Sequence, residues 1–138
     1  MSRIDGLQAA LAAEHAAVYL YAVLGGRTSR VANARLYASL RSAHAHHRSR
    51  RDHLTGLLAA AGAVPTPAAG GYTTPPGIDR PGGVRAAALA IEQAAADTYA
   101  YLVGEVTGRE RAWAVTALTD AAVRSLDFGG TAEPLPGL

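Results

Sequence analysis

Two short links and one long link separate four helical segments, and this spacing constrains the fold more than any other feature of the sequence. Apolar residues recur every three or four positions, which predicts helices over residues 3–24, 30–61, 84–106 and 109–128. Ser2 and Asp5 are spaced like a capping box at the start of the first helix. The short links, around 25–29 and 107–108, predict two antiparallel helix hairpins.

The middle link, residues 62–83, is rich in proline and glycine and has no helical pattern. A helix of about 22 residues is roughly 33 Å long, and an extended link gaining about 3 Å per residue can run its whole length. The sequence therefore predicts one all-α domain over residues 1–138, a four-helix bundle with a long crossover between helices two and three. An up-down-up-down bundle with a loose loop remains the alternative.

Composition restricts the chemistry that such a bundle can carry. The chain has no cysteine, which excludes thiolate metal sites and disulfides. Its formal charge of +2 is too small to indicate a nucleic-acid partner by itself. The N-terminal segment has charges at Asp5 and Glu14 and no signal-peptide pattern, and no uninterrupted apolar run approaches about 20 residues. We expect a cytoplasmic protein with no membrane partner.

Polar residues occupy core positions on three of the predicted helices. Glu14 lies in the apolar line of the first helix and Glu92 in that of the third, at positions where leucine would be usual. A buried carboxylate costs several kcal/mol unless it is paired, coordinated or protonated. The second helix contributes His47, which lies on the line defined by its leucines. These three side chains are predicted to converge inside the bundle.

The stretch "HAHHRSRRDH", residues 44–53, holds four of the five histidines, but helical phase divides it. Successive residues of a helix are turned by about 100° around its axis. On that basis His47 lies on the apolar line, Arg51 lies about 40° away from it, and His44 and Arg50 lie about 60° away. The remaining histidines are predicted to face solvent. The apolar line of the fourth helix contains no metal ligand and consists of Val115, Leu118, Ala122 and Leu126. Asp120 is predicted to form a surface ion pair with Arg124, four residues on.

Two interpretations of these residues compete. In the first, Glu14, His47 and Glu92, with His44 one turn away, bind a single iron or manganese ion, because carboxylate and imidazole suit both metals. Two glutamates and one or two histidines are too few for a dinuclear centre. In the second, which we favour, the glutamates form a metal-free polar network. They are neutralised by Arg50 or Arg51 and hydrogen-bonded to His47 and to Tyr21 or Tyr99. Nucleic-acid binding by the arginines of helix two is a weaker alternative, because they are spread around the helix.

Five segments spaced along the chain resemble a small bacterial ferritin-like domain family of unassigned function. They are "LAAEHAAVYLYAVLG" (11–25), "HRSRRDHLTGLL" (47–58), "IEQAAADTYAYLV" (91–103), "ALTDAAVRS" (117–125) and "LPGL" (135–138). The resemblance covers essentially the whole chain and implies a ferritin-like four-helix bundle.

The resemblance also implies a partial set of metal ligands. Glu14, His47 and Glu92 match ligand positions of the wider ferritin-like superfamily. His44 stands where that pattern has glutamate, and 120–123 stands where it has Glu-x-x-His. We therefore expect a non-catalytic bundle that acts by binding, as a monomer or homodimer, without an identifiable substrate. The alternative is an iron- or manganese-dependent oxidoreductase with an incomplete site.

Overall fold

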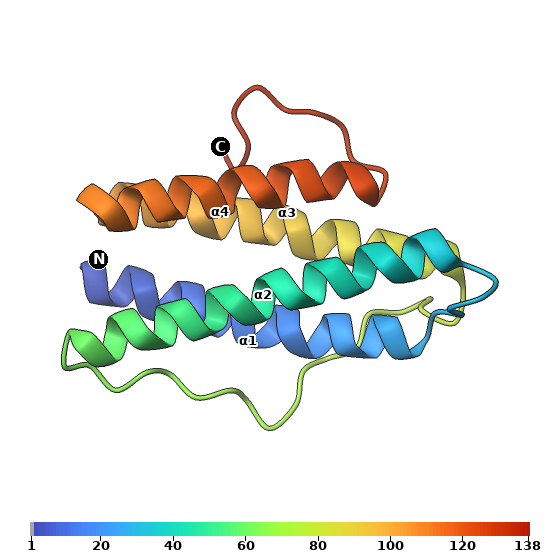
Figure 1. The fold of residues 1–138 in the computed structure, drawn as a ribbon, viewed down its shortest axis with the longest axis horizontal. Coiled ribbons are helices and arrows are strands. Elements are labelled where there is room, and N and C mark those ends of the chain that lie inside the picture. Colours follow the sequence, from blue (N-terminus) through green and yellow to red (C-terminus); the bar gives the residue numbers. More distant parts are fainter. Residues whose placement is uncertain (1) are drawn as a thin grey trace.

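The structure, a computed structural model, describes residues 2–138, which form four α-helices and no strand. The prediction of an all-α chain with four helices is confirmed. The helices lie side by side and nearly parallel to one axis (Figure 1). Their bounds are α1 (Arg3–Gly26), α2 (Ala34–Ala60), α3 (Pro81–Glu105) and α4 (Gly108–Asp127).

The helix ends show where local chemistry overrides periodicity. The capping box at Ser2 and Asp5 is present, as predicted. α2 begins at Ala34 rather than at residue 30, because the Ser29 hydroxyl accepts the backbone N–H of Ala32 at 3.0 Å and holds a separate turn. α3 begins at Pro81 rather than at residue 84, because the fixed φ of proline suits the first helical position.

Gly83, placed in the link by the sequence, is instead a helical residue under a close backbone contact. A Cβ atom at this position would lie 1.8 Å from the carbonyl oxygen of Gly77. Only glycine lets the preceding loop pass this close to the first turn of α3. Gly83 therefore marks the packing of the loop on the helix and not the end of the link.

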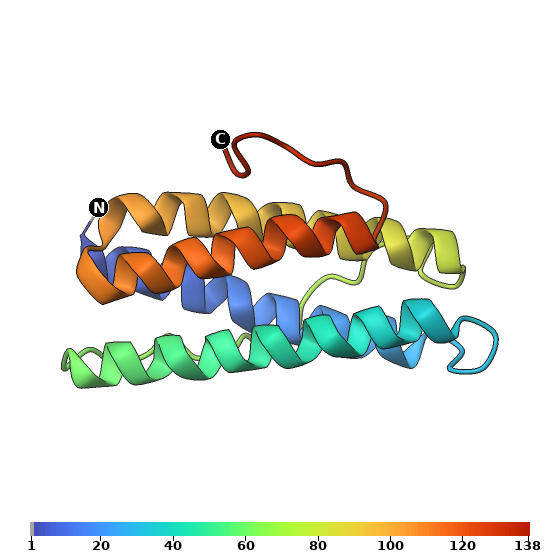
Figure 2. The ribbon, with the colours of Figure 1, turned by 45° about the horizontal axis from the view of Figure 1, so that its top comes forward.

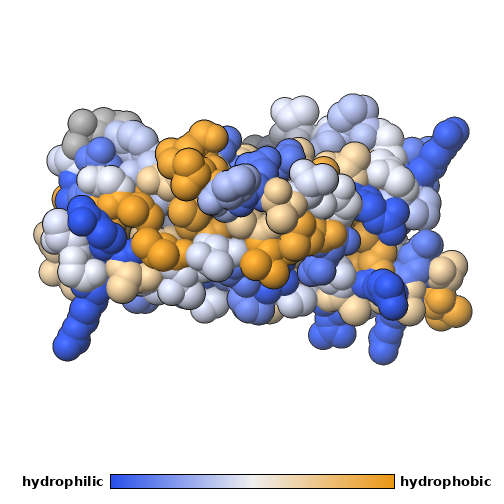
Figure 3. All heavy atoms as spheres, turned by 90° about the horizontal axis from the view of Figure 1, so that it is seen from above, coloured by the Kyte–Doolittle hydropathy of each residue, from blue (hydrophilic) through white to orange (hydrophobic). Residues whose placement is uncertain are grey.

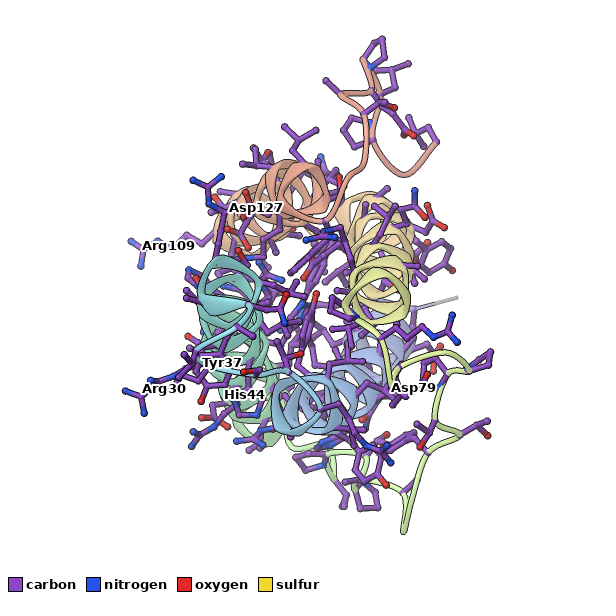
Figure 4. All side chains as sticks on the ribbon, turned by 90° about the vertical axis from the view of Figure 1, so that its right-hand side faces the viewer. Arg30, Tyr37, His44, Asp79, Arg109 and Asp127 are labelled. Atoms are coloured by element: carbon purple, nitrogen blue, oxygen red, sulfur yellow. The ribbon has the colours of Figure 1, made fainter. Side chains whose placement is uncertain are left out.

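α1 and α2 form one antiparallel hairpin, and α3 and α4 form the other (Figure 2). The hairpins meet mainly through α1 and α3, whereas α2 contacts α3 and α4 more sparsely. Viewed end on, the helices form a ring in the order α1, α2, α4, α3, with side chains filling its interior (Figure 4). The interior is therefore lined by all four helices.

The segment between α2 and α3 runs along α1 from the end of α2 to the start of α3 (Figure 1). Gln8 donates to the carbonyl of Val64 at 2.7 Å and accepts the N–H of Thr66 at 2.8 Å. Further along, His15 contacts the carbonyl of Thr66 at 2.9 Å. The ring of Tyr72 then lies 5.3 Å from that of Tyr19, the distance joining their centroids. These contacts follow α1 in sequence order, so α2 and α3 run in the same direction.

α1 is long and apolar enough, by length and composition, to cross a membrane. This differs from the sequence expectation because its many alanines raise the hydropathy of the whole helix without forming a continuous run of large apolar side chains. In this structure α1 is a core helix, with Leu7, Leu11 and Leu24 fully buried. Core helices and membrane-spanning helices can have the same length and hydropathy, and α1 is an example.

Candidate functional site

A polar layer crosses the interior of the bundle between two apolar clusters. One cluster lies around the start of α1 and the end of α2, and includes Leu7, Leu11, Leu54, Leu58 and Leu102. The other lies around the end of α1 and the start of α2, and includes Leu24, Leu36, Leu40, Val84 and Phe128. The buried charged residues between them are Glu14, His47, Arg50, Glu92 and Arg124.

His47 lies at the centre of this layer, between two glutamates from different helices. Its Nδ1 is 2.5 Å from Oε2 of Glu14 on α1, and its Nε2 is 2.9 Å from Oε1 of Glu92 on α3. All three side chains are at most 2% exposed. The imidazole thus contacts α1 of its own hairpin through Nδ1 and joins the two hairpins through Nε2.

Two tyrosines add a hydrogen bond to each of these glutamates. The Tyr99 hydroxyl donates to Oε1 of Glu14 at 2.5 Å, and the Tyr21 hydroxyl donates to Oε1 of Glu92 at 2.6 Å. The Tyr21 ring also stacks on the His47 imidazole, with 5.3 Å between centroids. We call the five residues Glu14, Tyr21, His47, Glu92 and Tyr99 the His47 centre.

The electrostatics of the His47 centre favour a charged imidazolium. Burial lowers the pKa of His47, but the hydrogen bonds and negative charges of Glu14 and Glu92 outweigh it and raise the pKa to about 9. An imidazolium has two N–H donors, one for each glutamate, whereas a neutral imidazole has only one. Burial, together with the charge of the adjacent glutamate, raises the pKa of both Tyr21 and Tyr99, so both hydroxyls stay protonated donors.

A second polar group, the arginine cluster, lies beside the centre and consists of three charged residues, Arg50, Asp120 and Arg124, with the neutral Ser42. Arg50 and Arg124 both bind the carboxylate of Asp120, with 3.1 Å from Arg124 Nε to Oδ2. Arg124 also donates to the Ser42 hydroxyl at 3.0 Å. Burial raises the pKa of Asp120, but the hydrogen bond from Arg124 and the charge of Arg50 have a larger effect in the opposite direction. The pKa of Asp120 is therefore below its usual value. The Arg50 guanidinium lies 5.6 Å from the ring centroid of Tyr99, which links the cluster to the centre.

The predicted site residues are thus partly brought together. Glu14, His47 and Glu92 meet, with both Tyr21 and Tyr99 bonded to them. The pairing of these glutamates with Arg50 or Arg51 needs correction, because His47 takes that place. Arg50 is buried but bonds Asp120, and Arg51 bonds its neighbour Asp52 at the surface.

His44 stays outside the centre. It lines a cavity of about 370 Å³ formed by α1 and α2, together with Tyr37 and Arg48. Burial and the charges of Arg48 and Arg51 lower the pKa of His44. One helical turn on α2 therefore separates an interior histidine from one that faces a groove at the surface.

The orientation of α4 differs from its predicted one, and this is where sequence reasoning missed functional residues. The buried residues of α4 are Ala114, Ala117, Ala121, Arg124 and Ser125. Val115 and Leu126, predicted to be core, are 44% and 45% exposed. Hydrophobic side chains accordingly appear on the surface seen from above (Figure 3). The three alanines at helical spacing were the available signal, because small side chains let α4 approach its neighbours closely and turn Asp120 and Arg124 toward α2.

An apolar cavity of about 170 Å³ opens between α1 and α3 and reaches the His47 centre. Five of its eleven lining residues are alanine, and Glu14, His47 and Tyr99 also line it. Across residues 2–138, no three or more histidine, aspartate and glutamate side chains are grouped so that they could hold a metal ion.

The comparisons with known proteins bear on the whole chain. The model of the family described as "Domain of unknown function (DUF4439)" matches residues 6–138. The chain belongs to this family. No curated protein matches the chain.

A solved structure extends the comparison of this DUF4439 chain to three dimensions. The chain is similar to the crystal structure of a conserved hypothetical protein, rv2844, from Mycobacterium tuberculosis, at 29% sequence identity and a TM-score of 0.82. The alignment covers 91% of this chain and 93% of that one. Neither description names an activity, so the chemistry of the polar layer carries the functional argument.

Proposed function

We propose that this DUF4439 chain is a ferritin-like four-helix bundle with a long crossover between α2 and α3. Two antiparallel hairpins joined by a long link are typical of that arrangement. The support is the common direction of α2 and α3, together with the contacts that hold the link along α1 at Gln8 and His15. An up-down-up-down bundle would instead place α2 and α3 antiparallel.

The residues of the His47 centre, as arranged, do not fit a metal ion. A metal ligated by imidazole and carboxylate needs lone pairs that converge on one point at about 2.0–2.2 Å. Here Glu14 and Glu92 lie on opposite edges of the ring, and each faces a different ring nitrogen. α4 supplies Asp120 to Arg50 and Arg124 instead of to the centre.

The charges of the polar layer also balance without a metal. Glu14, Glu92 and Asp120 provide three carboxylates, and an imidazolium and two guanidinium groups, on His47, Arg50 and Arg124, provide three cations. A divalent metal ion ligated by Glu14 and Glu92 would add two positive charges directly beside an existing imidazolium, at a cost in a medium of low dielectric constant.

The function best supported is therefore a non-catalytic one: a metal-free bundle that acts by binding, with its polar layer fixing how the two hairpins dock. Buried polar groups can specify one packing arrangement because every misaligned packing leaves a charge unpaired. The single observation that carries this proposal is that both ring nitrogens of His47 are taken by carboxylates of the chain itself.

Metal analysis tests the proposal. Protein purified without chelators should contain far less than one iron or manganese ion per chain, and adding either metal should leave Tm unchanged. Near-stoichiometric iron or manganese that disappears in Glu14→Ala would overturn the proposal. That result would favour a metal-dependent oxidoreductase, for which iron-dependent oxygen consumption is the next measurement.

A second measurement tests the centre directly. Nitrogen-15 NMR of the histidine rings at pH 7.5 should show one ring with both nitrogens protonated, and this signal should be absent from His47→Gln. A neutral His47 ring at that pH, in metal-free protein, would contradict the charge balance on which the proposal rests.

A further inference from the structure

The C-terminal segment, residues 129–138, forms one wall of a cavity that the His47 centre does not explain. The segment leaves α4, arches outward and returns to α3 (Figure 2). Between it and the two helices lies a cavity of about 300 Å³, which we call the tail cavity. Its polar lining residues are Glu92, Gln93 and Asp97 of α3, Ser125 of α4, and Thr131 and Glu133 of the segment.

Close backbone contacts hold this wall in place. The N–H of Gly130 donates to the carbonyl of Ser125 at 2.9 Å. Gly137 has a φ of +80°, and a Cβ atom there would lie 2.5 Å from the carbonyl oxygen of Ala96. The segment thus packs directly on the backbone of α3, as glycine permits. The tail cavity is a defined space and not a gap beneath a loose end.

The charge of the lining is one-sided. Glu92, Asp97 and Glu133 bring three carboxyl groups, of which Glu92 is already paired with His47, and no arginine or histidine is among the lining residues that the structure describes. Asp97 and Glu133 are exposed, whereas Glu92 is fully buried at the inner wall. A cavity with this lining attracts a cation and repels an anion.

Glu92 supplies an independent sign of a ligand. Its Oε1 accepts from both His47 and Tyr21, but its Oε2 is buried and has no hydrogen-bond partner among residues 2–138. A buried polar atom left without a partner costs about 1–3 kcal/mol, so most such atoms in proteins are satisfied. Glu92 belongs to the His47 centre and is also a lining residue of the tail cavity, so the residue with the unpaired oxygen is one that a donor in the cavity would meet.

We propose that the tail cavity binds a small aliphatic amine, whose ammonium group donates to Glu92. The apolar lining residues, Ala96, Ala122 and Pro136, suit a short hydrocarbon stem, and Asp97 and Glu133 suit a second amino group at the other end. The volume exceeds what a single metal ion fills, and it matches the lower end of cavities that hold small molecules. This inference goes beyond the proposed function and depends on it only in that Glu92 must be free of metal.

Titration calorimetry with 1,4-diaminobutane tests the proposal, with 1,4-butanediol and succinate as the neutral and anionic probes of similar length. We expect one saturable site for the diamine and none for the other two probes. The affinity should fall about 10- to 100-fold in Glu92→Gln, which removes the charge-assisted hydrogen bond. It should fall about 2- to 5-fold in Glu133→Gln, where the carboxylate is exposed.

Controls keep the outcomes distinct. Glu133→Gln and Asp97→Asn change only exposed side chains, so they report on binding even if Glu92→Gln fails to fold. Asp127→Asn is the matched control, because it removes an exposed carboxylate of α4 that does not line the cavity. Absence of saturable diamine binding to the wild type, or equal affinity in Glu133→Gln, Asp97→Asn and Asp127→Asn, overturns the proposal.

The metal content of each sample is measured before titration. Stoichiometric metal contradicts the proposed function, whereas failure of a metal-free sample to bind the diamine contradicts the amine site. The diamine is titrated in either case. Amide NMR shifts on diamine addition should concentrate at Thr131 and Gly137, and shifts spread evenly over the chain would also count against the site.

Discussion

The His47 centre and the arginine cluster lie in the same polar layer but satisfy their charges in different ways. In the centre, one imidazolium serves two glutamates, and all three side chains are at most 2% exposed. In the cluster, two arginines serve one aspartate whose side chain is 29% exposed. The centre therefore depends on its single cation, whereas Asp120 of the cluster has both a second partner and water.

The largest expected effect follows from that dependence. His47→Leu removes the one cation between Glu14 and Glu92 and leaves two buried carboxylates without it. Breaking a buried ion pair at one partner costs about 3–5 kcal/mol. We expect a loss of that size in the free energy of unfolding, measured by urea denaturation at pH 7. A loss below about 1 kcal/mol would mean that the glutamates are not held as charged partners of His47.

A triple variant that replaces His47, Glu14 and Glu92 together tests whether the loss comes from unpaired charge. Combining His47→Leu with Glu14→Leu and Glu92→Leu removes both carboxylates along with the cation. Replacement of buried charges by well-packed apolar residues is often neutral or stabilising. The triple variant should regain most of the stability that His47→Leu loses.

Opposite pH limits are expected for the two regions. The pKa of His47 is raised from 6.5 to about 9 in the folded state, so its contribution to stability is complete below about pH 6.5 and is lost as pH rises through about 9. A shift of this size corresponds to a contribution on the order of 3 kcal/mol. Urea denaturation of the wild type between pH 6 and pH 9.5 should show this loss. His47→Gln, which cannot titrate there, should show a flat profile over the same range.

Asp120 titrates at the other end of the scale. Its pKa is lowered in the folded state, so its contribution is present above the usual value of 3.8 and is lost as pH falls through the folded-state pKa. The stability difference between the wild type and Asp120→Asn should therefore shrink as pH falls below about 4. A constant difference across that range would show that the arginines do not favour the charged form of Asp120.

The two tyrosines are expected to differ in how much they stabilise the protein, because each donates to a different glutamate. Tyr99 provides the hydrogen bond to Oε1 of Glu14, whereas Oε1 of Glu92 accepts from His47 as well as from Tyr21. Tyr99→Phe leaves a buried carboxylate oxygen without a donor, so it should cost about 2–3 kcal/mol. Tyr21→Phe should cost about 1 kcal/mol less, and thermal or urea unfolding of both variants measures the difference. Equal losses would contradict the asymmetry between Glu14 and Glu92.

The sequence predicted the His47 centre better than the arginine cluster, and helix composition explains why. On α1 and α3 the glutamates follow unambiguous lines of larger buried residues, such as Leu7, Leu11 and Tyr99. On α4 the buried line consists of alanine, while valine and leucine face outward. Periodicity of large apolar residues then gives the wrong face. The predicted pair of Asp120 with Arg124 is present, but it lies against the bundle and includes the buried Arg50, which the sequence does not indicate.

Two features of the site could not be predicted even where the helix faces were right. Which cation reaches the glutamates depends on the distance between hairpins, because an imidazole spans a shorter gap than a guanidinium on its long stem. The tail cavity depends on how residues 129–138 fold back on α3. The only sequence signal for this packing is the presence of glycine at positions 130 and 137, where the backbone contacts are close. Both are properties of packing between segments that are distant in the chain.

The smallest expected changes in stability are those at Arg50 and Arg51. Helical phase offers these adjacent residues as alternative partners for the glutamates. Arg50 is 7% exposed and binds Asp120, which keeps Arg124 as a second partner. Arg50→Met should therefore cost about 1–2 kcal/mol, less than the loss of a fully buried pair, because the aspartate stays paired and partly hydrated. Arg51 is 27% exposed and binds only Asp52 in the structure, so Arg51→Met should change stability by less than about 0.5 kcal/mol. Both variants keep an unbranched apolar side chain of similar reach, so the comparison isolates the guanidinium group. If Arg51→Met instead proved as costly as His47→Leu, Arg51 and not His47 would be the cation that the buried glutamates require.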